Sequence, residues 1–292
     1  MTVILDRTPV SVRRATLRTL SRLEARRYAR HPLFLTGTML LVVVTALTST
    51  SRAAARPVLG EAVYPAFLLG IVGLLVAHRL TLSTRRARDV IEAAPADGVT
   101  RTAAMCLACL VSLAAGILWF AWTQLAWALW PPDGQADGFG RVGSGNRLAI
   151  MLAGSIASFG GPLLGVANAR WLRMRGAALA VAFALVAWAL AGDRVVELDP
   201  QSRARNLLRL TAPYTIWTTG APGKGDWRNA GSPLWRLAYL AALCGLAAVT
   251  AVLSAASGDR RRRLLAVGAV VAAVGAGALL LAAFTGPDMM RL

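Results

Sequence analysis

Residues 21–47 read SRLEARRYARHPLFLTGTMLLVVVTAL. Four of the first ten positions are arginine, a His-Pro pair follows at 31–32, and the run from 33 to 47 is apolar. Two arrangements place a basic helix directly before such a run. One is a nucleic-acid-binding arm ahead of a soluble core, and the other is a helix on a membrane surface ahead of a membrane span.

The composition of the chain decides for the membrane. Of the 292 residues, 56% are hydrophobic and 16% are charged, whereas a soluble domain carries about 25% charged residues. The net charge of +18 lies in short arginine clusters between apolar runs, which is the positive-inside pattern of membrane proteins and not that of a nucleic-acid interface. Lys224 is the only lysine, and this preference for arginine indicates a GC-rich coding genome and favours a bacterial source.

We expect an all-α, polytopic membrane protein with about seven transmembrane helices. A spanning helix needs roughly 17 to 25 mainly apolar residues. Residues 1–32 are predicted to be a cytoplasmic segment and 33–292 a single transmembrane domain. The predicted spans are 33–50, 62–82, 102–129, 148–169, 176–192, 234–256 and 264–285.

The arginine clusters predict the orientation of these spans. If the arginine-rich N-terminus is cytoplasmic, seven spans place the clusters at 83–101, 170–175 and 259–263 on the same side, as the positive-inside rule requires. The segment 193–233 then lies outside, as a large extracytoplasmic loop. Its arginines are a weak exception, because long loops are translocated largely regardless of charge.

Residues 11–30 are predicted to form an amphipathic interface helix. On a helical wheel one side collects Val12, Leu17, Leu20, Leu23 and Tyr28, and the other carries Arg14, Arg18, Arg22 and Arg26 at i, i+4 spacing. Such a helix suits the boundary between anionic headgroups and acyl chains, so membrane lipids are expected partners. Glu24 is placed to pair with Arg27 or Tyr28, and Pro32 is expected to break the helix. A plain juxtamembrane anchor is the alternative.

The sequence offers few candidates for catalysis, and no enzyme activity is expected. The two histidines, His31 and His78, have no nearby cysteine or carboxylate cluster, so no metal site is predicted. Cys106 and Cys109 form a C-x-x-C inside an apolar helical run and are interpreted as packing residues. The stretch GAPGKGDW at 220–227 lacks the first glycine and the Ser or Thr of a phosphate-binding loop. We interpret it as a turn-rich loop that cannot support ATP hydrolysis.

Polar residues inside the predicted spans are the candidates for a translocation path. They are Thr123, Gln124, Ser155 and Ser158. Hydrogen bonding between helices is the alternative for Gln124. The adjoining Gly160-Gly161-Pro162 is either a hinge or a tight helix crossing. None of the windows has an Asp or Glu in its middle, which argues against a proton-coupled transporter that works alone.

The cytoplasmic stretch 83–101, STRRARDVIEAAPADGVTR, is the candidate docking surface. It is too long for a tight turn and is predicted to hold a short helix that ends at Pro95. Arg85, Arg86 and Arg88 alternate there with Asp89 and Glu92. A surface with both signs of charge suits a protein partner, and a solvated linker is the alternative.

With these features the chain resembles the permease subunits of type-2 ATP-binding cassette (ABC) exporters. In that family an amphipathic interface helix precedes the first span, as 11–30 does here, and a coupling helix lies between the second and third spans, as in RRARDVIEAAPADGVTR. The stretch RLEARRYARHPLF is similar to the entry segment of actinobacterial members. The loop 193–233 matches the large outer loop after span five. The family core has six spans, so either 264–285 is an added helix or one of the seven windows does not fully cross, the short window 176–192 being the first candidate.

The resemblance implies a function and a set of partners. This chain would form the path of an ATP-driven exporter in the bacterial cytoplasmic membrane, together with a second permease copy or a sister permease. Two separate ATPase subunits would bind ATP and Mg, and this chain would bind no cofactor. The coupling residues implied are Arg85, Arg86, Arg88, Asp89, Glu92, Pro95 and Asp97, with Arg18, Arg22, Glu24 and Arg26 on the interface helix. The alternative is a structural or regulatory membrane subunit without a path, and an intramembrane enzyme is a third, disfavoured hypothesis.

Overall fold

The protein is an all-α polytopic membrane protein. The computed structural model describes residues 10–50, 59–86, 97–131, 142–172, 174, 176–198, 202–215, 218–221, 225–228, 230–286 and 290–291. Within these ranges, six helices are long and apolar enough to cross a membrane. A seventh span results if the bent pair α1–α2 is counted as one.

The long helices fall on the seven predicted windows. The first two windows correspond to α2 (Pro32–Thr50) and to a segment built from a 3₁₀ turn η1 (Leu59–Ala62), α3 (Val63–Pro65), a π-helix η2 (Ala66–Ile71) and α4 (Val72–Arg86). The next are α6 (Gly98–Ala108) with α7 (Leu110–Leu129), and α8 (Ser144–Trp171). The last are α9 (Ala177–Leu198), α11 (Pro233–Leu253) and α12 (Gly258–Phe284).

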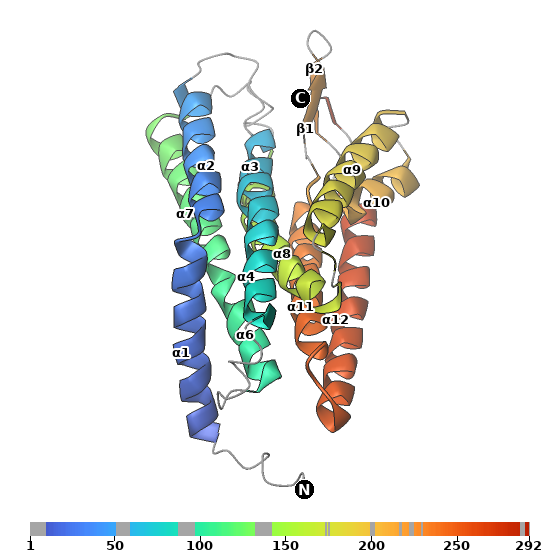
Figure 1. Ribbon diagram of the computed structural model, residues 1–292. Coiled ribbons are helices and arrows are strands. Elements are labelled where there is room, and N and C mark those ends of the chain that lie inside the picture. Colours follow the sequence, from blue (N-terminus) through green and yellow to red (C-terminus); the bar gives the residue numbers. More distant parts are fainter. Residues whose placement is uncertain are drawn as a thin grey trace, which may run out of the picture.

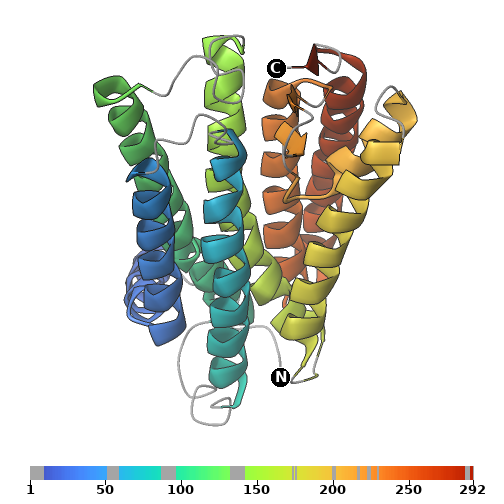
Figure 2. The same cartoon turned by 90° about the horizontal axis from the view of Figure 1, so that it is seen from above.

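Helix α8 occupies the centre of the molecule and separates two groups of helices (Figures 1 and 2). One group contains α1 (Val10–Ala29), α2, the η1–α4 segment and α6–α7, and the other contains α9, α10 (Arg203–Thr211), α11 and α12. Glycines on α8 allow backbone contact with the η1–α4 segment. A methyl group at Gly154, Gly161 or Gly165 would overlap the carbonyl groups of Ala62, Gly70 or Leu74. This small-residue packing is typical of membrane helix pairs.

Both helices of this contact depart from the regular α-helical hydrogen-bond pattern near its middle. The π-helix Ala66–Ile71 contains Gly70, and Pro162 on α8 follows directly after Gly161. Proline has no N–H to donate to the carbonyl four residues earlier, and the Ser112 hydroxyl of α7 donates to that carbonyl, Ser158 O, at 3.0 Å. Helix α8 therefore continues through Pro162, and the Gly-Gly-Pro sequence forms the tight crossing that was one of its two predicted roles.

The chain bends between α1 and α2, as Pro32 predicted. The two helices meet at 61° across residues 30 and 31. The backbone N–H of Leu33 donates to His31 Nδ1 at 3.3 Å, so the imidazole caps the start of α2. Partial burial, and then the nearby Arg79 cation, lower the pKa of His31 from its usual 6.5. The neutral imidazole that accepts this bond is the favoured form.

At the end of the molecule opposite α1 (the α10 end), the loop 193–233 contains structure that the sequence only partly predicted. Helix α10 lies within this loop, and the stretch at 220–227, interpreted from the sequence as a turn-rich loop, contains strand residues. Strands β1 (Thr218–Ala221) and β2 (Gly225–Arg228) pair antiparallel, with Thr219 opposite Trp227, and β3 (Met290–Arg291) joins β2. This small sheet is the exception to the helical fold.

Two arginines at the α10 end are almost fully buried. The Arg236 guanidinium of α11 donates to the carbonyl oxygens of Leu210 and Ala212, which end α10. Arg209 donates to Asn206 Oδ1 through Nη2 at 3.0 Å. Burial, and then the neighbouring Arg236 cation, lower the pKa of Arg209 to about 9, while the Asp193 carboxylate acts in the opposite direction. The two Arg236 bonds hold α10 against α11, whereas the Arg209 bond lies within α10.

Candidate functional site at the arginine end

The end of the molecule opposite α10 collects α1, the start of α6 and the connection between α11 and α12 (lower part of Figure 1). We call it the arginine end, because it contains the ladder Arg14, Arg18, Arg22 and Arg26 and the cluster Arg260–Arg263. The charge pattern placed these segments on one side of the membrane. The helix arrangement brings them to one end of the bundle.

Helix α1 lies along α6 with its arginine ladder exposed. Arg14, Arg18, Arg22 and Arg26 face away from the bundle, and Leu17 and Leu20 are half-buried. Leu23 differs from the wheel prediction: it is 52% exposed, because only the side of α1 that carries Leu17 and Tyr28 faces the protein. Part of the apolar side of α1 therefore packs on the bundle, and the part that carries Leu23 stays exposed.

Tyr28 anchors α1 in the bundle. Its side chain is completely buried, and its ring lies 5.0 Å from that of Phe34 on α2. A methyl group placed on Gly73 of α4 would lie 2.5 Å from the Tyr28 hydroxyl and 2.8 Å from Pro162 of α8. The hydroxyl makes no hydrogen bond within the described part of the chain, although Ser112 is near. Tyr28 therefore joins α1 to the place where α4 and α8 meet.

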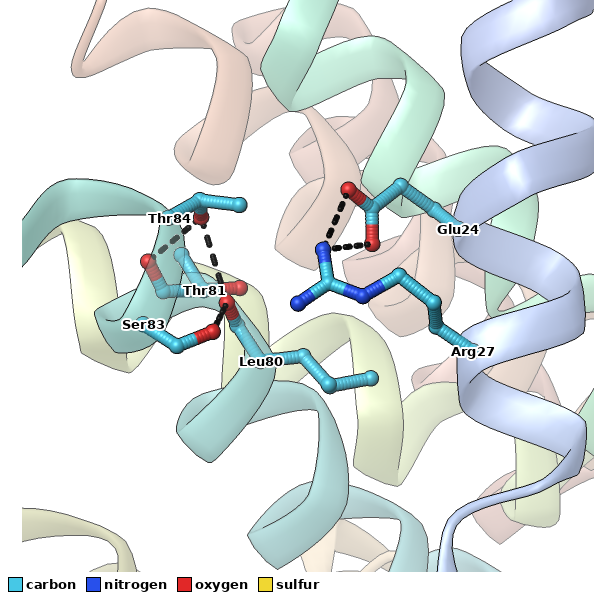
Figure 3. Close-up of polar contacts among 6 residues, drawn as sticks. All are labelled: Glu24, Arg27, Leu80, Thr81, Ser83 and Thr84. Carbon is cyan, nitrogen blue, oxygen red and sulfur yellow. Dashed lines mark hydrogen bonds and ion pairs between the residues drawn. The ribbon is translucent and has the colours of Figure 1, made fainter. Parts of the chain in front are cut away.

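Glu24 and Arg27 of α1 lie beside the end of α4 (Figure 3). Arg27 Nη1 donates to Glu24 Oε1 at 3.0 Å, which confirms the predicted pair. On α4, the hydroxyl of Thr84 donates to the carbonyls of Leu80 and Thr81 at 3.1 and 2.8 Å. The ion pair itself stabilises α1 by only a few tenths of a kcal/mol. The pair is a local contact within α1.

Asp97 connects this stretch to the arginine cluster of α12. One carboxylate oxygen, Oδ1, caps α6 by accepting the Thr100 N–H at 2.8 Å, and the other, Oδ2, accepts from Arg260 at 3.3 Å. Gly98 lies next to Ala255, just before α12 begins. Asp97 and the cluster 259–263 each stand out in the sequence, but 163 residues separate the two partners. No local pattern in the sequence indicates that pair.

The structure describes only some of the other predicted coupling residues. Arg85 and Arg86 are the last residues of α4. Arg88, Asp89, Glu92, Pro95 and the short helix predicted there lie outside the described residues. The docking role of this stretch therefore stays a prediction.

The candidate path residues lie in helix contacts. Ser155 Oγ donates to Gly116 O of α7 at 2.8 Å and Ser158 Oγ to Ser112 O of α7 at 3.3 Å, and both serines are fully buried. Thr123 donates to Trp119 O of its own helix at 3.0 Å. The Gln124 amide nitrogen is buried without a hydrogen-bond partner among the described residues. The serines thus join α7 to α8, whereas the two readings of Gln124 stay open.

A second group of buried polar side chains lies where α4 packs on α8. His78 and Thr81 of α4 and Asn168 of α8 are buried, and their side-chain polar atoms have no hydrogen-bond partner within the described ranges. His78 lies beside the backbone of Gly165, close to the Leu74–Gly165 contact. Polar residues near the end of a span look like boundary residues in a sequence, and only the packing of α4 on α8 shows that they are enclosed.

Comparison with known proteins gives no relative: no protein-family model, no curated protein and no solved structure matches the chain.

Proposed function

We propose that this chain is the membrane-spanning permease subunit of an ATP-driven exporter of the type-2 ABC class. The observation that carries the proposal is the anchoring of α1 by Tyr28 at the contact of α4 with α8. A partner that moves α1 can move the membrane-spanning helices only if α1 is fixed to them. Tyr28 provides this connection at the arginine end.

The proposed mechanism transmits motion from a soluble ATPase to the central helix contact. The ATPase docks on the stretch 83–101 and against α1, and ATP binding draws these segments together with those of a second permease copy. Tyr28 then displaces α4 relative to α8 at Gly73 and Pro162, next to the π-helix Ala66–Ile71. π-helical segments are frequent at functional sites, and in the proposal this one absorbs the movement of α4 relative to α8.

The proposal includes the surroundings and partners of the chain. The arginine clusters orient the N-terminus and the stretch 83–101 to the cytoplasm of a bacterial cell, in its cytoplasmic membrane. Two ATPase subunits, which hold ATP and Mg, complete the exporter with this chain and either a second copy or a sister permease. The sequence offers this chain no phosphate-binding loop of its own.

One observation favours the alternative of a structural or regulatory subunit. Ser155 and Ser158, two of the four residues predicted to line a path, have hydroxyls that bond within the α7–α8 contact. In the exporter these residues line the path only in a second conformation, in which α7 and α8 separate. In a structural subunit α7 and α8 stay in contact, and the two serines keep these hydrogen bonds.

Affinity purification of the tagged protein in mild detergent tests the proposal. We expect a soluble ATPase with a phosphate-binding loop at near-equal amount, and at least tenfold less of it with the triple variant Arg88→Ala, Asp89→Ala and Glu92→Ala. Arg203→Gln, at the α10 end, is the matched control and is expected to retain the ATPase. Full retention by the triple variant contradicts the docking assignment. Purification without any ATPase favours the structural subunit.

A further inference from the structure

A long apolar groove runs along one side of the bundle, between α6–α7 and α11 with α8 as its floor. Its volume is about 630 Å³. Ala103 and Leu113 mark its extent on α6–α7, Val252 and Ala241 on α11, and Phe159 contributes from α8. The groove carries no charged residue in its lining. A groove of this size and chemistry in a membrane protein is a site for an apolar ligand.

The length of the groove corresponds to one leaflet of a bilayer. Ten residues separate Ala103 from Leu113, so with about 1.5 Å of rise per residue the wall is roughly 15 Å long. This is half of the hydrocarbon core, which is about 30 Å thick. The walls run antiparallel, because Gly98 at the start of α6 lies next to Ala255 beyond the end of α11.

Positive charge gathers at one end of the groove only. Its Ala103–Val252 end lies at the arginine end of the molecule, close to Gly98 and to the Asp97–Arg260 pair. Arg170 of α8 lies near Cys106, which lines this part of the groove. Arg260 is partly exposed and pairs with Asp97, and the exposed side chains of Arg261, Arg262 and Arg263 follow it around the first turn of α12. An anionic group at this mouth of the groove therefore meets the Arg260 guanidinium, at the end of the molecule that is rich in arginine.

We propose that the groove is a binding site for an anionic phospholipid of the leaflet at the arginine end. One acyl chain fills the groove from Ala103 to Leu113, and the phosphate contacts Arg260 and its neighbours. A transmembrane helix from a second copy fits less well, because it is about 10 Å wide and must continue through both leaflets, whereas the groove extends through one. The site is independent of the transport proposal, and a structural subunit would contain it equally.

Photo-crosslinking in nanodiscs tests where the acyl chain lies. The purified full-length protein is placed in equal parts phosphatidylglycerol and phosphatidylcholine, with a trace of either lipid carrying a diazirine on its acyl chain. We expect the phosphatidylglycerol probe to label peptides around 103–113 and 241–252 several times more strongly than the exposed face of α12 around Val270. Equal labelling of the groove and the α12 face contradicts the site. A crosslink between two copies at the groove also overturns it.

A steric variant and its control sharpen this test. Ala241→Phe with Ala248→Phe fills the groove from the α11 side, whereas Ala269→Phe adds the same ring to the exposed face of α12. We expect the first variant to lose groove labelling and the second to keep it. Persistent labelling of a folded Ala241→Phe, Ala248→Phe protein contradicts the proposal. If this double variant does not fold, the labelling map of the unaltered protein still decides the location.

A pair of charge variants tests the headgroup contact. Arg260→Gln removes a guanidinium at the mouth of the groove. Asp97→Asn removes the ion pair but leaves Arg260 charged and still caps α6, since Asn is a good N-cap. A basic residue near an anionic surface contributes about 1 kcal/mol. We therefore expect the phosphatidylglycerol to phosphatidylcholine ratio of tightly bound lipid, measured by native mass spectrometry, to fall about fivefold for Arg260→Gln and not for Asp97→Asn. An unchanged ratio in Arg260→Gln overturns the headgroup assignment.

Discussion

At the scale of single residues, Tyr28 is the residue on which the proposed coupling depends. Its ring is enclosed by α2, α4 and α8, and its hydroxyl is buried without a hydrogen bond among the described residues. Packing therefore holds α1 in place, and the hydroxyl adds little. If α1 lay on the membrane surface without contacting the bundle, the side chain at position 28 would not be enclosed by other helices.

Variants of Tyr28 separate packing from hydrogen bonding. Tyr28→Ala is expected to lower the free energy of unfolding by about 3 kcal/mol, as large-to-small changes of buried aromatic residues do, and to release α1. Tyr28→Phe keeps the ring, and we expect it to change the free energy of unfolding by less than about 1 kcal/mol. Thermal unfolding in detergent and hydrogen exchange of α1 measure both effects. A Tyr28→Ala protein as stable as the original, with α1 still protected, would rule out the anchor.

His31 makes the bend between α1 and α2 sensitive to pH. Because the folded protein lowers the pKa of His31, its contribution to stability is complete above about pH 6.5. That contribution decreases as the pH falls through the lowered pKa, when the protonated Nδ1 no longer accepts the Leu33 N–H and its charge faces Arg79. We expect the protection of the Leu33 amide, that is, the intrinsic exchange rate divided by the observed rate at the same pH, to decrease as the pH falls below about 6.5.

The control for this prediction is His31→Asn. Asparagine is a favourable N-cap and does not titrate, so the exchange at Leu33 should keep only the intrinsic pH dependence of an amide. If the variant shows the same loss of protection as the original protein, His31 is not the titrating group.

At the scale of elements, the apolar windows predicted the membrane-spanning helices found among the described residues, because a spanning segment is determined by its own composition. The irregular elements were not predictable in this way. The π-helix Ala66–Ile71 lies where Gly70 meets Gly161 of another helix. Arg209 and Arg236 look like ordinary loop or boundary arginines, and only the fold shows that carbonyl and amide groups enclose them. The docking stretch remains the least determined part, because most of it lies outside the described residues.

Helix α10 is expected to depend on Arg236. The side chain donates to Leu210 O and Ala212 O in a buried setting, so Arg236→Met leaves two buried carbonyls without these donors. An unsatisfied buried group costs about 1–3 kcal/mol, and we expect a loss of about 3 kcal/mol and rapid exchange of the α10 amides. Arg203→Gln removes a bond from an exposed guanidinium to Phe284 O and should cost below about 1 kcal/mol. Similar losses for the two variants would contradict the account of α10.

At the scale of the whole molecule, the two groups of helices meet at α8, and the arginine end carries the segments that face a partner in the proposal. The α10 end is held by buried arginines and a small sheet. The bundle is thus restrained at the α10 end and exposes charged segments at the other. This asymmetry suits a membrane subunit that a soluble motor drives from one side.

The most direct test of this account is photo-crosslinking in intact cells from an unnatural amino acid at position 88, within the predicted docking stretch. Position 130, where Trp130 is 74% exposed at the opposite end of α7, is the control. The account predicts a crosslink from position 88 to a soluble ATPase with a phosphate-binding loop, and none to that ATPase from position 130. The absence of any ATPase crosslink from position 88, or its appearance from position 130 instead, would contradict the central claim.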